Sequence, residues 1–318
     1  MSSPKTVSGP QRPAGVDLRT KVGTLSLRNP IIAASGTFGY GVEFAHLVDL
    51  NALGGIVVKG LSAEPMAGAP APRMCETASG IVNAIGLQNI GVRAFIAEKL
   101  PQLRQFRTAI IANVFGHSVA EYIEVIRALE DAEGIAAYEL NISCPNVQKG
   151  GIEYSTDPAL TTEVVGAVRK ASSRPLWVKL SPVVGSIGLI AKAAESAGAD
   201  ALVIANTYPA MCLDVHNHRS RLGSTTGGLS GAAIKPITVR LVYEANRVIR
   251  IPIVGLGGIE SAPDVAEYVV AGATAVEVGT AHFADPRASE KLVKGLEKWC
   301  RDQNLPGISG LRGSLQAS

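Results

Sequence analysis

Short runs of apolar residues recur along the chain, and segments with helical periodicity separate them. Most runs are continuous in apolar residues rather than alternating, which is typical of strands buried on both faces of a parallel sheet. We place eight such strands, at residues 30–34, 55–58, 109–112, 137–140, 176–178, 201–205, 252–256 and 275–278. This pattern predicts an α/β fold, a single (β/α)8 TIM barrel.

Helical segments fill most of the gaps between these strands, although the first two crossovers show no clear helix. The helices are expected at residues 118–131, 158–171, 187–197, 232–247, 262–271 and 286–301. The connections after Lys59 up to Ile90 and from Thr207 to Gly231 are too long for plain crossovers, so we expect long active-site loops there. Residues 1–14, rich in Pro, Ser and Gly, predict a flexible tail before one domain spanning residues 15–318.

Composition narrows the class of protein. The 30 Lys and Arg balance 27 Asp and Glu without any basic run, which argues against a nucleic-acid partner. Charges or turn residues interrupt every apolar stretch before the ~18 residues that a membrane helix needs. The four cysteines, Cys75, Cys144, Cys212 and Cys300, contain no CxxC pair and give neither a disulfide framework nor an iron–sulfur site. We therefore expect a cytoplasmic protein.

The strand ends are unusually polar. In a (β/α)8 barrel the active site lies at the carboxyl ends of the strands. Each of these residues alone could simply begin a turn, but together they predict a polar pocket. They are Ser35, Lys59, Asn113, Asn141, Lys179, Asn206, the Gly257–Gly258 pair and the Gly279–Thr280 pair.

The last two strand ends are glycine turns that precede helices. Such turns let backbone N–H groups approach a phosphate, and strands 7 and 8 commonly form that site. Tight turns without any ligand would look the same. The run from Gly227 to Gly231 could supply a third wall of amides or be a bare flexible loop.

Two lysines and one cysteine carry candidate chemistry. Lys59 and Lys179 end nearly apolar strands, where burial is unfavourable unless each meets an anion or acceptor, for example the negative charge of a reduced flavin. Either could instead extend to solvent. Cys144 follows a strand end between Asn141 and Asn146, where it could accept a proton or be an inert buried thiol.

Five segments resemble those of the dihydroorotate dehydrogenases, and the likeness runs from about residue 22 to the last helix. They are NPIIAASGTFGYG (29–41), ETASGIVNAIGLQN (76–89), ELNISCPN (139–146), TTGGLSG (225–231) and VGTAHFADP (278–286). Of these, residues 76–89 point most specifically to the class 1B catalytic subunit.

The resemblance implies FMN as the cofactor and dihydroorotate as the substrate. The flavin ring would contact Ala34, Ser35, Gly36, Lys59, Asn113, Asn141 and Lys179, and the phosphate would contact Gly231, Gly257, Gly258, Gly279 and Thr280. The substrate would contact Lys59, Asn83, Gly86, Leu87, Asn141, Asn146, Asn206 and Thr207.

The resemblance also implies the reaction of pyrimidine biosynthesis. Cys144, the catalytic base, would take the proton from C5 while C6 delivers hydride to flavin N5 and orotate forms. Lys59 would be the second catalytic residue. Residues 147–157 would form a lid that excludes water.

Class 1B enzymes form heterotetramers, in which a homodimer of the catalytic chain pairs with a subunit carrying FAD and a [2Fe-2S] cluster and electrons pass to NAD. The family's membrane-bound class has serine in place of this cysteine and an amino-terminal extension that we do not find here. The resemblance therefore implies a partner subunit.

Three other functions remain open from the residues. A dihydropyrimidine dehydrogenase barrel would act on uracil or thymine, and a Schiff-base aldolase would use Lys59 or Lys179 as nucleophile. Dihydrouridine synthesis on tRNA would need a basic face that the chain lacks. Cys212, His216 and His218 have a spacing that a metal could use, but we expect no metal site because no fourth ligand is visible.

Overall fold

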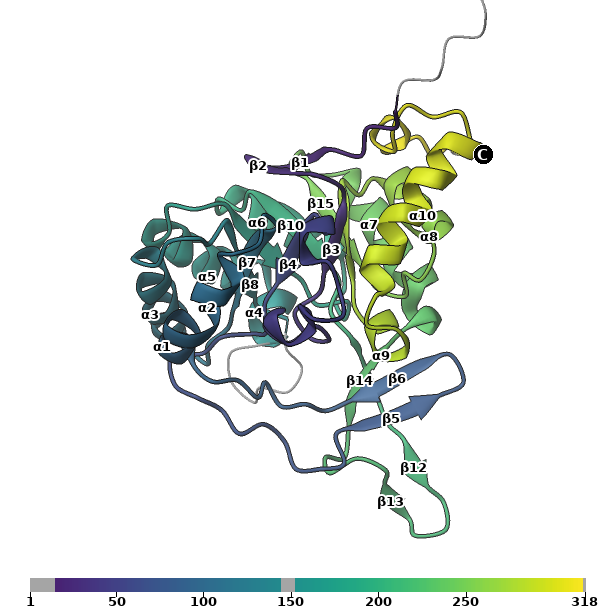
Figure 1. Cartoon of the computed structure of the whole chain (residues 1–318). Coiled ribbons are helices and arrows are strands. Elements are labelled where there is room, and N and C mark those ends of the chain that lie inside the picture. Colours follow the sequence, from purple (N-terminus) through teal and green to yellow (C-terminus); the bar gives the residue numbers. More distant parts are fainter. Residues whose placement is uncertain (1–14, 144–151, 317–318) are drawn as a thin grey trace, which may run out of the picture.

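The computed structural model describes residues 15–143 and 152–316, and all eight predicted strands lie in this part of the chain. They form a closed parallel barrel in the order β10-β15-β16-β3-β4-β7-β8-β9, which confirms the predicted fold (Figure 1). Its strands are β3 (Ile31–Ala33), β4 (Gly55–Val57), β7 (Ala109–Val114), β8 (Ala137–Asn141), β9 (Leu176–Lys179), β10 (Ala201–Ile204), β15 (Ile253–Leu256) and β16 (Ala275–Val278).

Alternate residues of each strand belong to two different apolar clusters. On β8, Tyr138 and Leu140 belong to the large cluster between the strands and the surrounding helices, whereas Ala137 belongs to a small cluster inside the barrel. Val22 and Leu27 join the interior cluster from the antiparallel hairpin of β1 (Thr20–Val22) and β2 (Leu25–Leu27). This hairpin closes the end of the barrel opposite the carboxyl ends of the strands (Figure 1).

The six predicted helices are all present. They are α3 (Val119–Glu130), α5 (Pro158–Ala171), α6 (Ile187–Ser196), α7 (Lys235–Asn246), α8 (Ala262–Ala271) and α10 (Ala288–Asp302). Side chains of Ser118, Asp157 and Ser261 accept hydrogen bonds from the first-turn N–H groups of α3, α5 and α8, and these caps fix where the helices begin. The last helix begins two residues later than predicted, because the short helix α9 (Ala281–Ala284) ends at Asp285, which is extended.

The first two crossovers, where no helix was clear, contain short helical pieces. The 3₁₀ helices η1 (Val42–Phe44) and η2 (Leu50–Ala52) connect β3 to β4. Before β7, the chain forms α1 (Val92–Ala94), the π-helix η3 (Phe95–Lys99) and α2 (Leu100–Leu103). Two further 3₁₀ helices, η4 (Ala232–Ile234) and η5 (Ser309–Leu311), precede α7 and follow α10. None of the described helices is both long and apolar enough to cross a bilayer.

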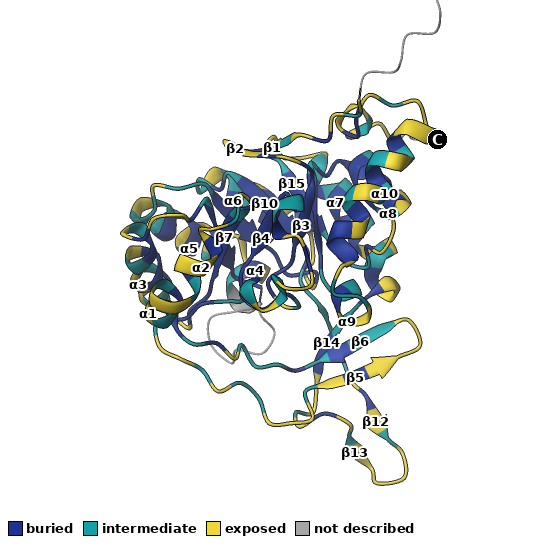
Figure 2. Ribbon diagram, viewed as in Figure 1, coloured by how far each residue is buried: buried dark blue, intermediate teal, exposed yellow. Residues whose placement is uncertain are grey.

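The two long connections, residues 60–90 and 207–231, are more than plain crossovers, as predicted, and they contain short strands that the sequence did not indicate. They contribute an antiparallel sheet in the order β11-β14-β6-β5, beside the carboxyl ends of the barrel strands (Figure 1). Its strands are β5 (Met74–Thr77), β6 (Gly80–Asn83), β11 (Tyr208–Ala210) and β14 (Gly227–Ser230), and a hairpin of β12 (Leu213–Asp214) and β13 (Arg219–Ser220) projects beyond it. β14 is the most buried of the four strands, whereas β5 is largely exposed (Figure 2).

The expected lid at residues 147–157 is only partly described. Ile152–Thr156 form helix α4 and Asp157 caps the next helix, so the described half of the expected lid is helical. Residues 144–151, which include Cys144 and Asn146, lie outside the described residues, as does the expected tail at residues 1–14.

Candidate active site

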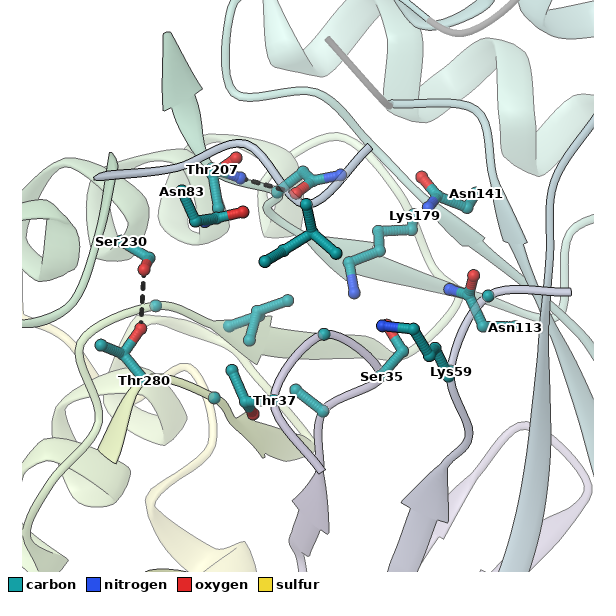
Figure 3. Close-up of a pocket in the computed structure, with 18 of the residues that line it drawn as sticks. Ser35, Thr37, Lys59, Asn83, Asn113, Asn141, Lys179, Thr207, Ser230 and Thr280 are labelled. Carbon is teal, nitrogen blue, oxygen red and sulfur yellow. Dashed lines mark hydrogen bonds between the residues drawn. The ribbon is translucent and has the colours of Figure 1, made fainter. Parts of the chain in front are cut away.

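The polar strand ends and the added sheet meet in one pocket at the carboxyl end of the barrel (Figure 3). It contains every described residue that the sequence nominated: Ala34, Ser35, Gly36, Lys59, Asn83, Gly86, Leu87, Asn113, Asn141, Lys179, Asn206, Thr207, Gly231, Gly257, Gly258, Gly279 and Thr280. It also contains residues that the sequence analysis missed: Thr37, Gly60, Ile85, Gln88, Ala205, Ser230, Ile234, Leu256 and Phe283. Seven of these nine residues are direct chain neighbours of a nominated residue, so the sequence located the motifs but did not show how many residues of each line the pocket.

One end of the pocket, which we call the glycine end, is built from backbone. It comprises Gly231, Gly257, Gly258, Gly279 and Thr280, at the ends of β14, β15 and β16. The N–H groups of the last four of these donate no hydrogen bond to any other described residue. Backbone N–H groups without partners at turns that lead into helices are suited to a phosphate.

Glycine is required at this end because the backbones approach too closely for a side chain. A Cβ on Gly258 would lie 2.7 Å from the carbonyl oxygen of Gly231, and the φ of Gly258 is +66°. Gly231 itself, at φ +100°, lies against the Cα of Gly80. The segment that could have been a flexible loop is therefore strand β14, with Gly231 at its end.

The opposite end of the pocket, which we call the lysine end, is built from side chains. It comprises Lys59, Asn113, Asn141 and Lys179, at the ends of β4, β7, β8 and β9. In Figure 3 the ammonium groups of Lys59 and Lys179 both extend into the pocket. Their surroundings differ sharply.

Lys179 meets two buried carboxyl groups, as its burial required. Its Nζ lies 3.0 Å from Glu139 Oε1 and 3.4 Å from Glu277 Oε2. Asn113 Nδ2 donates a hydrogen bond to the same Oε1 of Glu139. Burial alone would lower the pKa of Lys179, but the two glutamates outweigh burial and the pKa is raised. Lys179 is therefore a fixed ammonium ion.

Lys59 has no such partner. Within the described residues, no carboxylate oxygen lies within 4.0 Å of the Lys59 ammonium group, and this ammonium group forms no hydrogen bond. Burial lowers the pKa of Lys59, and the positive charge of Arg73 lowers it further. A partly buried cation without a counter-ion is a site for an anionic ligand.

Amides line the wall between the pocket and the added sheet. Asn83 Nδ2 donates to the carbonyl of Gly228 at 3.1 Å, which anchors the side chain to β14. Asn206 Nδ2 donates to Ser143 Oγ at 2.9 Å, and its Oδ1 accepts from the N–H of Thr207 at 2.8 Å. These amides are oriented before any ligand binds, and they offer donors and acceptors suited to a pyrimidine ring.

Glu139 and Glu277 are the residues whose part in the site the sequence analysis missed. The sequence did contain a signal for them, because each glutamate interrupts an otherwise apolar strand. Glu139 lies two positions after Ala137, and Glu277 lies two positions after Ala275, and both alanines face the barrel interior. Period-two alternation places both carboxyl groups inside the barrel. Their proximity to Lys179 required the closed barrel to be known.

The Cys212 loop does not bring metal ligands together. Cys212 is buried with Cys75 in a small apolar cluster on the added sheet, whereas His216 and His218 are exposed. Across residues 15–143 and 152–316, no three His, Cys, Asp or Glu side chains gather as a metal site would require.

Comparison with known proteins agrees with this geometry. The family model described as dihydroorotate dehydrogenase matches residues 17–299. A protein from Solibacter usitatus named putative dihydroorotate dehydrogenase A (fumarate) is 54% identical over 94% of this chain and 98% of its own. A protein from Trichlorobacter lovleyi named dihydroorotate dehydrogenase B (NAD(+)), catalytic subunit, is 49% identical over 94% of this chain and 98% of its own, and a protein of the same name from Geobacter sp. is 47% identical over 96% and 99%. The chain therefore belongs to the dihydroorotate dehydrogenase family of oxidoreductases.

Proposed function

We propose that this pocket binds FMN together with dihydroorotate and oxidises the latter to orotate. The observation that carries the proposal is a pocket with two separate sites for anions. The free N–H groups of the glycine end suit a phosphate, and the unpaired Lys59 at the lysine end suits a carboxylate or an anionic ring.

The residues present fit FMN. A Cβ on Gly36 would meet no protein atom within 4 Å, and one on Gly279 would approach no atom closer than 3.8 Å, so both glycines leave space on the pocket side. The glycine end would hold the phosphate of FMN, while Asn113, Asn141 and Lys179 would present hydrogen-bond donors to the edge of the flavin ring. FMN, when bound, supplies the hydride acceptor, and the protein supplies binding, orientation and electrostatics.

The chain's own residues divide the remaining tasks. Lys59 would hold the negative charge of the substrate, and Asn83, Asn141, Asn206 and Thr207 would orient the pyrimidine ring so that C6 faces the cofactor. Cys144, which lies outside the described residues, would take the C5 proton as a thiolate. Its neighbours Ser143 and Asn141 are described, and both belong to the hydrogen-bonded amide wall of the pocket.

An aldolase reaction at Lys179 fits this geometry poorly. A Schiff base requires a neutral amine, whereas two carboxyl groups hold Lys179 in its charged form. Neither the uracil-reducing nor the tRNA-modifying alternative gains support, because the family model and the relatives are named for dihydroorotate.

For the electron acceptor, we propose a partner subunit that carries FAD and a [2Fe-2S] cluster and reduces NAD, in a cytoplasmic heterotetramer. Relatives named as NAD-linked catalytic subunits support this assembly. The described cysteines, Cys75, Cys212 and Cys300, are buried and belong to two separate apolar clusters, so they do not form a cluster site. Fumarate is the second candidate acceptor, because the Solibacter relative is named for it.

A substitution at Cys144 tests the reaction. Cys144→Ser should fold and bind FMN but lose roughly 100-fold to 10,000-fold of its dihydroorotate oxidation near neutral pH, because a serine hydroxyl is a far weaker base. Steady-state assays should compare dihydroorotate with dihydrouracil, and Cys300→Ser, at a buried site on α10, is the matched control. Wild-type turnover in Cys144→Ser would remove Cys144 from its role.

The acceptor is tested with the same protein. Fumarate and NAD should be compared as oxidants for the purified chain and for the complex co-purified from the native host, with iron and FAD quantified. NAD reduction that requires the co-purified subunit supports the class 1B assignment. Rapid fumarate reduction by the chain alone would replace it.

A further inference from the structure

Glu139, Glu277 and Lys179 bring three ionisable groups together inside the barrel, directly beneath the pocket. β8 and β16 lie on opposite sides of the barrel ring, so the two glutamate side chains meet across its interior, and Lys179 reaches them from β9. Both glutamates are 0% exposed. Bulk water therefore does not reach these carboxyl groups.

The charges of these three groups do not balance if all are ionised. Two carboxylates and one ammonium would leave one net negative charge in a fully buried site, which is strongly unfavourable. One bound proton makes the group neutral. Because Lys179 contacts both glutamates and its ammonium form is favoured, the proton belongs on a carboxyl group.

The hydrogen bonds indicate which carboxyl group carries the proton. Glu139 Oε1 accepts from both Asn113 and Lys179, so Glu139 has the better-stabilised anion. Among the described residues, Glu277 accepts a hydrogen bond only from Lys179, at the longer distance of 3.4 Å, and its other polar neighbour is the Glu139 carboxyl group. One oxygen of each carboxyl group, Glu139 Oε2 and Glu277 Oε1, is buried without a partner among the described residues. A proton on Glu277 Oε1 that is donated to Glu139 Oε2 would give both of these oxygens a partner.

The two pKa shifts agree with this assignment. Burial raises the pKa of Glu277 well above its usual value, and the charge of Glu139 raises it further. Burial also acts to raise the pKa of Glu139, but Lys179 and the hydrogen bonds to Glu139 outweigh it, and the pKa is lowered.

We propose that Glu277 is a positioning residue that carries a proton at neutral pH, shares it with Glu139, and so makes a neutral unit that fixes the Lys179 ammonium at the cofactor side of the pocket. The role toward the cofactor rests on the proposed FMN site, whereas the shared proton does not. The unit supplies the cofactor with an N–H donor without adding net charge to the pocket floor. Lys59 is then the cation that provides net charge.

The shared proton can be tested on the protein without cofactor. The infrared spectrum of the wild type at neutral pH should contain the band of a protonated carboxylic acid, shifted in D₂O, and Glu277→Gln should lose it. Glu139→Gln should lose it as well, because Glu277 then ionises to pair with Lys179. Glu244→Gln, at a partly exposed residue paired with Arg240 on α7, is the matched control and should keep the band. A wild type without the band overturns the proposal, even if neither variant folds.

The positioning role is tested on the FMN-loaded protein. Glu277→Gln keeps a neutral group of the same shape, so its FMN reduction potential should equal that of the wild type. An ionised Glu277 would instead give a positive shift on substitution, because a negative charge beside the cofactor is removed, and that shift overturns the proposal. Glu277→Leu lacks both the donor and the acceptor and should bind FMN roughly tenfold more weakly, with affinity rescued in Glu277→Gln. Wild-type affinity in Glu277→Leu would likewise overturn it.

These outcomes are separable from the proposed function. If the chain binds no FMN, the proposed function fails while the infrared measurement still decides the protonation of Glu277. If FMN binds and the band is missing, the proposed function stands and the shared proton is wrong.

Discussion

Under the proposed function, the two ends of the pocket would recognise anions by opposite means. At the glycine end, recognition depends on missing side chains, because only bare backbone can place several N–H groups at one point. At the lysine end, recognition depends on charge. Carboxyl groups balance the positive charge of Lys179, whereas the positive charge of Lys59 has no counter-ion among the described residues. A backbone site is fixed by sterics, whereas a side-chain site is adjusted by its neighbours.

The largest effect should follow from removing the unpaired charge. Lys59→Met is expected to lower kcat/KM for dihydroorotate roughly 100-fold to 1,000-fold, because the anion loses its partly buried cation. FMN should still bind through the intact glycine end, and the apo protein should not lose stability, since no ion pair is broken. Steady-state kinetics and flavin titration measure both, with Lys298→Met on the exposed face of α10 as the control. An unchanged kcat/KM would show that Lys59 does not bind the anionic substrate.

At the glycine end, the corresponding substitution should act on the fold itself. Gly258→Ala forces a side chain into a backbone of φ +66°, with its Cβ 2.7 Å from Gly231 O and 2.8 Å from Lys235 Cβ. We expect a loss of about 1–3 kcal/mol in the free energy of unfolding and at least tenfold weaker FMN binding. Gly310→Ala, which meets no atom within 4 Å, is the control. Equal stability of the two variants would show that the turn tolerates a side chain.

The glycine end also carries a pH dependence of its own. His282, on α9 behind the Gly279–Thr280 turn, lies 3.4 Å from Thr37 Oγ1 and 2.9 Å from Ser289 Oγ. Burial lowers its pKa from 6.5 to about 4, so the unfolded chain binds this proton more readily than the folded one. The stability contributed by neutral His282 is therefore complete above pH 6.5 and declines as the pH falls toward 4.

The size of this loss should be about 2 kcal/mol at pH 5. Urea denaturation at pH 7 and pH 5 measures it, and His282→Gln should be less sensitive to pH over that interval because it has no imidazole to protonate. An equal loss of stability in wild type and variant would assign the acid sensitivity to other groups.

The same contrast explains what the sequence could and could not disclose. The barrel strands were predictable because burial on both faces leaves continuous apolar runs. The Gly257–Gly258 and Gly279–Thr280 turns were predictable because the glycines directly follow strands, whereas the approach of Gly231 to Gly258 depends on the added sheet. For the lysine end, the sequence indicated the lysines and amides but not the carboxyl groups that pair with Lys179. Lys179 was identified, but its partners Glu139 and Glu277 are 40 and 98 positions away, and only barrel closure brings them together.

The added sheet was missed for a different physical reason. Its strands are three or four residues long, and β5 exposes three of its four residues, so neither length nor alternation marks them. Their stability comes from pairing across long connections: β6 pairs with both β5 and β14, which lies more than 140 positions further along the chain. Residues 76–89 were nonetheless assigned to the pocket by their family resemblance, and Asn83, Gly86 and Leu87 do line it.

The smallest effect should separate two kinds of glycine in the pocket. Gly36 lies in the loop after β3, between the strands that carry the two ends, and a Cβ there would meet no protein atom within 4 Å. Gly36→Ala should therefore leave the apo stability within about 0.5 kcal/mol of the wild type. Because the methyl group projects into space that we assign to FMN, the affinity for FMN should fall roughly fivefold to tenfold. Thermal unfolding with and without FMN, beside flavin titration, measures both effects. If the apo protein and the FMN affinity are both unchanged, the cofactor does not pass over Gly36, and the flavin ring must lie nearer to the added sheet than the two-ended pocket implies.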